Sequence, residues 1–289
     1  MSEKLDQFFT KPDTAHLCWN SLLPVLRTLT GKPINDLFFI EPSAGDGVFY
    51  DLLPEGQDRR MGVDIAPLRT DFVKHDFLTW DYRPFFHPRK DIVIVGNPPF
   101  GTRGDLAVNF FNKAATLADT IAFIVPVIFR KHFIHKQLPT GLRWVYSNDL
   151  PRNAFRTLKK TDYEVNTEFQ IWTRFPSIHK DRRLFARPPI VHKDFQMWQY
   201  NNTPQMLKVF KNDFDFAVPC QGWQDYTRRE TDPQKCEKQK QWILFAPNDK
   251  KVFSRLYEMD FSNLAMKNTT IIPGFRKGDI VQEYTYLYD

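Results

Sequence analysis

The feature that most constrains the fold is an alternation that runs through the first 175 residues. Short apolar runs rich in β-formers alternate there with longer segments of mixed pattern. This alternation favours strands and helices that take turns around a parallel sheet, and therefore predicts an α/β fold. We expect strands at residues 37–40, 60–63, 91–95, 121–125, 143–146 and 168–173. We expect helices at residues 14–29 and 105–117, and a short one after Phe129.

The pattern changes after residue 175. Residues 175–189 carry three prolines and a dense set of charges, which indicates a connection between units. Residues 190–289 contain short aromatic runs, such as residues 214–218 and 242–245, separated by polar segments. A chain of 289 residues has room for two domains. We therefore expect one domain at residues 1–175 and a second at residues 176–289.

Membrane insertion and secretion are not expected. The longest strongly apolar stretch, residues 121–129, contains Pro126 and is far shorter than the roughly 20 residues of a membrane span. The first residues, MSEKLDQFF, mix charges of both signs and lack the basic and then apolar layout of a secretory signal. A cytoplasmic location is the expectation.

The cysteines and histidines do not indicate a metal site or a disulfide scaffold. The three cysteines, Cys18, Cys220 and Cys236, form no CxxC pair, so buried free thiols are expected. His132 and His135 have helical spacing, but no carboxylate or cysteine near them completes a ligand set. No metal is expected.

The positive charge is concentrated in the middle of the chain. Residues 130–193 hold 14 Lys and Arg against 5 Asp and Glu, a net charge of +9, whereas the whole chain carries +6. Aromatic residues, including Trp144 and Phe155, are interleaved with these cations. Cations that neutralise phosphates and rings that stack on bases are what a nucleic-acid groove requires. A solvated basic surface would have the same composition, so charge alone leaves both readings open.

A glycine loop follows the first expected strand. The sequence EPSAGDGVF begins at Glu41, and Gly45 and Gly47 allow a tight turn and a close approach to a nucleotide-like cofactor. Asp64 closes the next apolar run, where a carboxylate can accept the two ribose hydroxyls of such a cofactor. Asp76 and Phe77 follow the presumed third strand, where they could contact an adenine amino group and its ring. Each acid alone could be an ordinary turn residue, but together they favour a cofactor site.

A second block, DIVIVGNPPFG, runs from a buried strand into a stiff loop. Pro98 and Pro99 have a fixed φ and donate no hydrogen bonds, and Pro98 keeps Asn97 out of the helical region. The Asn97 side chain and the Pro98 carbonyl are thereby expected to accept both hydrogens of one exocyclic amine. Phe100 can stack on the ring that carries this amine. The block predicts a site that activates an aromatic amine as a nucleophile.

The order of these motifs resembles that of the S-adenosylmethionine-dependent N6-adenine DNA methyltransferases, in the gamma arrangement. The resemblance rests on EPSAGDGVF, Asp64, HDF and NPPF, and on DQFFTKPDTA near the start, where Lys11 separates a Thr and a Pro that are adjacent in the family. It implies a Rossmann-like sheet of seven strands in the order 3-2-1-4-5-7-6, followed by a target-recognition unit. It implies S-adenosyl-L-methionine as cofactor and double-stranded DNA as partner, with the target base flipped out of the helix.

The resemblance also assigns roles to residues. The expected catalytic residues are Asn97, Pro98, Pro99 and Phe100. The expected cofactor contacts are Thr10, Glu41, Pro42, Ala44, Gly45, Gly47, Asp64, Ile65, Asp76, Phe77 and Asn97. The expected substrate contacts are Phe100, Phe155, Arg182, Arg183 and Arg187.

Three alternatives stay open at this stage. An RNA adenine methyltransferase is the nearest, because NPPF would bind the base and not the sugar. A protein glutamine methyltransferase holds an amide with a similar Asn-Pro-Pro-Tyr motif, but it has little need of the +9 segment. A non-catalytic nucleic-acid-binding module on a decayed fold would not need Asn97, Gly45 and Asp64 intact. The sequence does not indicate an oligomeric state.

Overall fold

The chain divides into two compact units, Met1–Phe185 and Ala186–Asp289. The computed structural model describes residues 8–81, 91–157, 161–176, 180–269 and 271–288. The division falls later than the boundary expected after residue 175. Residues 181–184 remain with the first unit because Arg182 N donates to Trp144 O at 2.9 Å and the Arg183 side chain is buried there.

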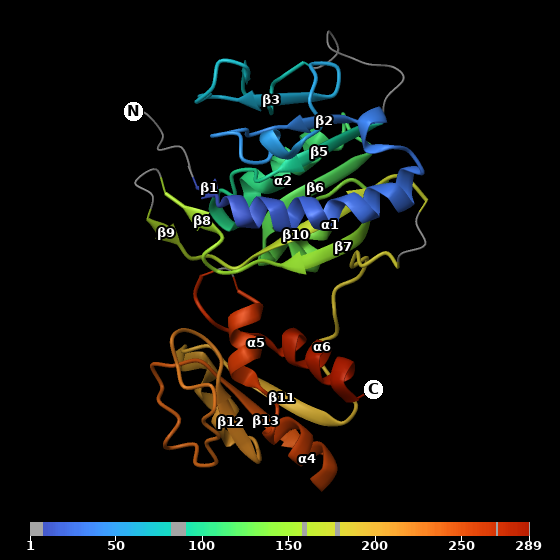
Figure 1. Cartoon of the computed structure of the whole chain (residues 1–289). Helices are drawn as coiled ribbons and strands as arrows, with labels where there is room; N and C mark the ends of the chain where they lie inside the picture. The colour runs from blue at the N-terminus through green and yellow to red at the C-terminus, as the bar shows by residue number, and fades with distance from the viewer. Residues whose placement is uncertain (1–7, 82–90, 158–160, 177–179, 270, 289) are drawn as a thin grey trace. The chain divides into compact units, whose positions relative to one another are not determined.

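A mixed sheet of seven strands forms the centre of the first unit (Figure 1). Its strand order is β4-β3-β2-β5-β6-β10-β7, which confirms the predicted order 3-2-1-4-5-7-6 and the Rossmann-like class. Every described pairing is parallel except those of β10, which runs antiparallel to both β6 and β7. The strands are β2 (Phe38–Glu41), β3 (Arg60–Asp64), β4 (Val73–Lys74), β5 (Ile92–Gly96), β6 (Thr120–Pro126), β7 (Arg143–Asp149) and β10 (Thr167–Thr173).

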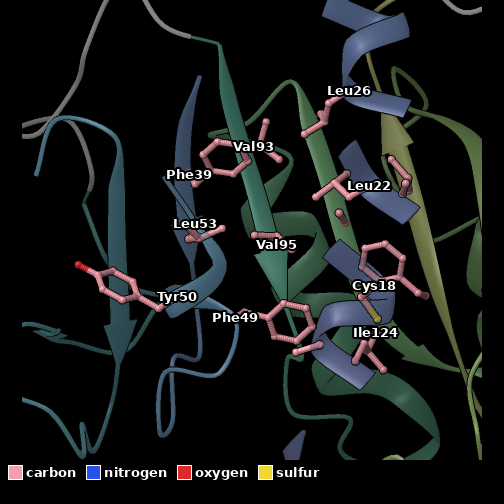
Figure 2. Close-up of a cluster of buried hydrophobic side chains, with 14 of the residues drawn as sticks. Cys18, Leu22, Leu26, Phe39, Phe49, Tyr50, Leu53, Val93, Val95 and Ile124 are labelled. Carbon is pink, nitrogen blue, oxygen red and sulfur yellow. The ribbon is translucent and has the colours of Figure 1, made fainter. Parts of the chain in front are cut away.

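Helices cover both faces of this sheet. Alternate residues of a strand point to opposite faces, and accordingly Val93 and Val95 pack in the cluster that includes α1 (Pro12–Thr30), whereas Ile94 packs with α2 (Asp105–Ala114). Figure 2 shows α1 contributing Cys18, Leu22 and Leu26 to the first cluster, close to Val95 and Ile124. Short helical segments are η1 (Ile34–Asp36), η2 (Tyr50–Leu52), η4 (Thr102–Gly104), η5 (Val127–Arg130) and α3 (His132–His135).

The ends of α1 follow from its sequence. Pro12 stands in the first turn, where a missing N–H costs nothing, and Gly31 ends the helix in the left-handed region with φ 63°. Pro24 lies inside the helix, so its position also lacks one backbone donor. The helix nevertheless continues, because its apolar side, which includes Leu22 and Leu26, is fully buried against the sheet.

A small antiparallel sheet brings the start of the chain to residues 150–163. β1 (Phe9–Thr10) pairs with β8 (Phe155–Arg156), which in turn pairs with β9 (Asp162–Tyr163). Lys11 N also donates to Ala154 O at 2.9 Å. The motif that contains Thr10 is therefore held as an added strand, which the sequence did not predict.

The second unit has its own sheet and core. β11 (Phe195–Tyr200), β13 (Trp242–Pro247) and β12 (Phe216–Pro219) form an antiparallel sheet in that order. The expected aromatic runs at 214–218 and 242–245 supply two of these strands. The other elements are η6 (Pro204–Lys211), α4 (Lys250–Tyr257), α5 (Phe261–Lys267) and α6 (Lys277–Tyr288). Among the described residues, no helix is both long and apolar enough to span a membrane.

Candidate cofactor and catalytic site

The glycine loop leaves the carboxyl end of β2 and is fixed by close contacts. Gly45 and Gly47 have φ values of 53° and 91°, in the region that favours glycine. A Cβ on Gly47 would lie 2.6 Å from Arg69 Nη1 and 3.1 Å from Phe72 Cζ, so no larger residue fits without displacing them. Ala44 N donates to Val63 O at 3.0 Å, which ties the loop to β3. The positive φ values agree with the tight turn expected at both glycines.

Asp64 lies beside this loop at the end of β3. Its Oδ2 accepts from Gly45 N and its Oδ1 from Ala66 N, both at 2.8 Å. Each carboxylate oxygen has further lone pairs, so the group can hold the loop and still accept from ligand hydroxyls. Ile65, next in sequence, is 53% exposed and offers an apolar surface at the same point.

Glu41 anchors the far end of the loop from inside the core. Its side chain is buried, and Oε2 accepts from Tyr50 N at 2.8 Å. Burial raises the pKa of Glu41 well above its ordinary value, and the nearby carboxylates of Asp46, Asp64 and Asp51 raise it further. Pro42 and Ala44, next to it, are buried as well. The raised pKa favours the neutral, hydrogen-bonding form of Glu41 beside the loop.

Asp76 and Phe77 follow β4, but they are engaged in local structure. Asp76 Oδ1 accepts from Leu78 N at 3.0 Å, as in a turn. Phe77 is 2% exposed, and its ring stacks on Phe110 with centroids 5.5 Å apart and packs near Trp80. The expected stacking of Phe77 on an adenine ring does not fit this placement, because the ring faces are used by the core. Phe77 instead supports the segment that carries Asp76.

The NPPF loop follows β5 and is linked to both the glycine loop and the start of the chain. Ser43 Oγ donates to Asn97 O at 3.0 Å, and Asn97 Nδ2 donates to Phe8 O at 3.3 Å. Asn97 Oδ1 is buried and has no hydrogen-bond partner among the described residues. A buried acceptor without a donor costs about 1–3 kcal/mol. The fold thus holds one amide oxygen ready for a donor that the described residues do not supply.

Left-handed backbone follows directly after Phe100. Gly101, Arg103 and Gly104 have φ values of 67°, 56° and 81°. A Cβ on Gly101 would lie 2.6 Å from Leu106 Cβ, so this glycine is needed where α2 begins. Two glycines three positions apart after NPPF are a sequence signal for this turn, which the expected site residues did not include. They set the direction in which the loop leaves the site.

The strand β1, near the start of the chain, packs against the glycine loop. The Phe9 ring lies 3.4 Å from the position of a Cβ on Gly45. Thr10, in the same strand, is 3% exposed. Arg156 of β8 forms an ion pair with Asp46 at 2.5 Å, and its guanidinium lies over the Phe9 ring. The Arg156–Asp46 pair thus joins the small sheet to the loop, and spacing along the chain gave no sign of it.

The aromatic residues near the NPPF loop differ from those expected to contact the substrate. Phe155 is 1% exposed, and its ring meets Phe100 edge to face at 6.2 Å in the core, so it has no free face for a base. Phe100 itself is partly exposed. Phe8 and Tyr163 stack with centroids 3.9 Å apart and are also partly exposed, and the Phe8 carbonyl is the one that Asn97 contacts. Phe8 and Tyr163 were missed because an isolated aromatic residue carries no sequence signal of its position.

The three arginines expected to contact substrate have different environments. Arg182 is exposed and donates from Nη1 to Ser147 Oγ at 2.9 Å. Arg187 is exposed and belongs to the second unit. Arg183 is buried, and its guanidinium donates to backbone carbonyls of residues 135, 138, 139 and 142. The expectation for Arg183 is therefore corrected, because its donors are used within the fold and cannot meet a phosphate.

Several other members of the basic segment also have internal partners. Arg130 pairs with Asp149 and Glu168, and Arg152 lies 3.6 Å from Glu164. Lys159 and Lys160 lie outside the described residues. Arg174 is exposed, but its guanidinium donates to the carbonyls of Ala115 and Ala118. The other exposed cations in the described part of this segment are Lys136, Arg143, Lys180, Arg182, Arg187 and Lys193.

His135 and the cysteines are structural. His135 Nδ1 accepts from Leu184 N at 2.9 Å, and burial lowers the pKa of His135 to about 4. The three thiols are free and buried, as expected, and burial raises the pKa of Cys236 to about 11. Among the described residues, no group of three or more His, Cys, Asp or Glu side chains is arranged to hold a metal ion.

Comparison with known proteins finds no matching family model and no matching curated protein sequence. Solved structures give distant likenesses. A Pyrococcus horikoshii protein provisionally assigned as an RNA methyltransferase is 18% identical, with a TM-score of 0.42, over 60% of this chain and 88% of that one. An S-adenosylmethionine-dependent methyltransferase from Anabaena variabilis is 9% identical, with a TM-score of 0.36, over 62% and 99%.

A further likeness extends along nearly the whole chain. The DrdV protein in a complex with DNA is 10% identical, with a TM-score of 0.38, over 96% of this chain and 40% of that one. The observed strand order, and not these distant likenesses, defines the fold of the first unit.

Proposed function

We propose that this chain is an S-adenosyl-L-methionine-dependent methyltransferase that methylates N6 of adenine in DNA. The observation that carries the proposal is the buried Oδ1 of Asn97, which lacks a partner among the described residues and lies in a loop stiffened by Pro98 and Pro99. An exocyclic amine is a donor of the kind this oxygen requires.

The residues of the glycine loop fit the cofactor. The two left-handed glycines allow the tight turn of the loop beside Asp64, and Asp64 has acceptor capacity beyond its two backbone hydrogen bonds. Thr10, Glu41 and Ile65 lie on the segments that surround this loop. When bound, the cofactor supplies a sulfonium methyl group as the electrophile.

The catalytic loop would act on the amine of the target base. Asn97 Oδ1 and the Pro98 carbonyl would each accept one N–H, which favours a pyramidal nitrogen with its lone pair free for attack. The amine nitrogen would take up the methyl group that the bound cofactor supplies and would then lose one proton to solvent. Phe100, partly exposed, would lie against the base. This route needs no covalent enzyme intermediate, which is consistent with thiols that are all buried.

A duplex substrate must present its target base outside the helix, because N6 is inaccessible within the stack. Flipping costs a few kcal/mol, which phosphate contacts and stacking must offset. Exposed cations in residues 130–193 are suited to the phosphates, and the second unit is suited to sequence selection as a target-recognition domain. DNA is favoured over RNA because residues 186–289 contain no recognisable RNA-binding motif.

The test uses labelled cofactor with DNA, RNA and protein pools, followed by identification of the methylated group. We expect N6-methyladenine in DNA. Label in RNA adenine or in protein glutamine would replace the proposed substrate with one of the alternatives. No label in any pool, with cofactor bound, would indicate a non-catalytic module.

The Asn97→Ala variant tests the carrying observation. We expect a rate loss on the order of a hundredfold or more, with cofactor affinity nearly unchanged, because the side chain acts on the substrate amine. Asn112→Ala is the matched control, since Asn112 Oδ1 is also buried without a partner among the described residues but lies on α2. Transfer retained above roughly a tenth of wild type in Asn97→Ala would refute this role for the loop.

A further inference from the structure

The side-chain amide of Asn97 could be placed in two orientations, and a contact from the start of the chain selects one of them. The nitrogen of an Asn amide only donates and its oxygen only accepts. Asn97 Nδ2 donates to Phe8 O at 3.3 Å, and Asn97 Oδ1 is buried without a partner among the described residues. The reversed amide would set two oxygens against each other at Phe8 and would leave Nδ2 where the free acceptor now lies. The Phe8 carbonyl therefore determines which atom of the amide is left for a substrate.

The position of the Phe8 carbonyl is set by the small antiparallel sheet. Phe8 directly precedes β1, and both residues of β1 pair with β8. Lys11, directly after β1, forms an ion pair with Asp162 of β9, with Nζ 2.7 Å from Oδ1. The acceptor for Asn97 Nδ2 is thus supplied by the β1-β8-β9 sheet, which lies far from the NPPF loop in the sequence.

A ring stack joins Phe8 to the last strand of the same sheet. Thr10 of β1 pairs with Phe155 of β8, which pairs with Tyr163 of β9. Phe8 lies two residues before Thr10 and therefore on the same face of the sheet as Thr10 and Tyr163. The Phe8 and Tyr163 rings stack with centroids 3.9 Å apart and 17° between their planes, and both pack against the core cluster that includes α1. Such a pair stabilises beyond the area that it buries, so Tyr163 restrains Phe8.

We propose that Tyr163 is a positioning residue for methyl transfer. Its ring holds Phe8, and the Phe8 carbonyl holds the Asn97 amide with Oδ1 toward the substrate amine. This rests on the proposed function and adds to it a role for the β1-β8-β9 sheet. The orientation of the amide matters most when the amine is aligned for attack, so its loss lowers the rate of transfer and leaves the affinities for DNA and cofactor nearly unchanged.

The first test compares methylation kinetics on DNA and cofactor binding in wild type, Tyr163→Ala and Tyr163→Phe. We expect kcat to fall about 3- to 10-fold in Tyr163→Ala, the range that corresponds to one neutral hydrogen bond, with KM for DNA and cofactor affinity nearly unchanged. Tyr163→Phe keeps the ring and should keep kcat. Tyr146→Ala is the matched control, because Tyr146 is also partly buried against the same core cluster but lies on β7.

A second test observes the Asn97 amide itself by nuclear magnetic resonance. Its side-chain NH2 signals are identified by their absence in Asn97→Ala, and their chemical shifts report the hydrogen bond to Phe8 O. We expect these signals to move or broaden in Tyr163→Ala and to stay in place in Tyr146→Ala. Asp162→Ala removes the ion pair with Lys11 and should move the same signals and lower kcat less. The Asp162 side chain is 56% exposed, so this variant serves where Tyr163→Ala does not fold.

Unchanged kcat or unchanged Asn97 signals in Tyr163→Ala, or in Asp162→Ala where the first variant does not fold, would overturn the inference. A raised KM for DNA at unchanged kcat would also overturn it, since the Tyr163 ring would then contact the substrate itself. Loss of cofactor affinity alone would assign Tyr163 to the glycine loop and likewise overturn it. A wild-type protein that methylates no DNA would refute the proposed function, and the Asn97 signals would still decide whether Tyr163 sets the amide orientation.

Discussion

Glu41 shows how a single buried carboxyl couples the glycine loop to pH. Its pKa is raised in the folded protein, so its contribution to stability is complete below the ordinary pKa of glutamate and is lost as pH rises through the folded value. Glu41→Gln keeps an acceptor for Tyr50 N and does not titrate. We therefore expect the variant to gain stability relative to wild type progressively as pH rises above the ordinary pKa of glutamate.

Thermal unfolding of both proteins at several pH values measures this difference. Glu258→Gln, at an exposed position, should follow the wild-type pH dependence and serves as the control. A constant difference in Tm between Glu41→Gln and wild type from pH 5 to pH 8 would contradict a raised pKa for Glu41.

At the scale of elements, the Arg156–Asp46 pair joins the β1-β8-β9 sheet to the glycine loop. Both side chains are about 30% exposed, so the pair contributes at most about 1 kcal/mol to stability. Its position over the loop predicts a kinetic effect instead. We expect Arg156→Ala to speed cofactor dissociation several-fold, measured by stopped-flow fluorescence. The same substitution in an Asp46→Ala background should add little, and strictly additive effects would show that the two residues act separately.

The turn after the NPPF loop depends on Gly101 in the same way that the glycine loop depends on Gly45 and Gly47. Gly101→Ala places a Cβ near Leu106 and in a left-handed backbone position. We expect lower stability by roughly 1–3 kcal/mol and reduced methyl transfer, measured by chemical unfolding and by transfer rate. Gly278→Ala is the control, because its Cβ would meet atoms no closer than 3.7 Å. Unchanged stability and transfer rate in Gly101→Ala would mean that the turn relaxes freely.

At the scale of the whole molecule, the sequence predicted the features that rest on a periodic apolar pattern or on residues with a restricted backbone. The alternation of strands and helices predicted the α/β class, and the family resemblance supplied the strand order that the sheet shows. The sequence could not predict which charged or aromatic side chains are buried, because the residue type is the same at a buried and at an exposed position. Arg183, Phe155 and Phe77 were accordingly given ligand roles, whereas the fold buries all three. The boundary between units shifted for the same reason, because Arg183 holds its own segment in the first unit.

The corrected set of basic residues leads to the last prediction, which concerns the electrostatics of nucleic-acid binding. Removing one cation that neutralises a phosphate should flatten the slope of log affinity against log salt by about 0.9 for duplex DNA. We expect this flattening in Arg182→Ala and Arg187→Ala, whose side chains are exposed, with similar weakening for every DNA sequence. Lys251→Ala removes an exposed cation outside residues 130–193 and should leave the slope unchanged. Arg183→Ala should instead lower Tm, because four backbone carbonyls lose their donor. Binding titrations from low to physiological salt decide the matter: equal slopes in wild type, Arg182→Ala and Arg187→Ala would place the phosphates on some other surface of the chain.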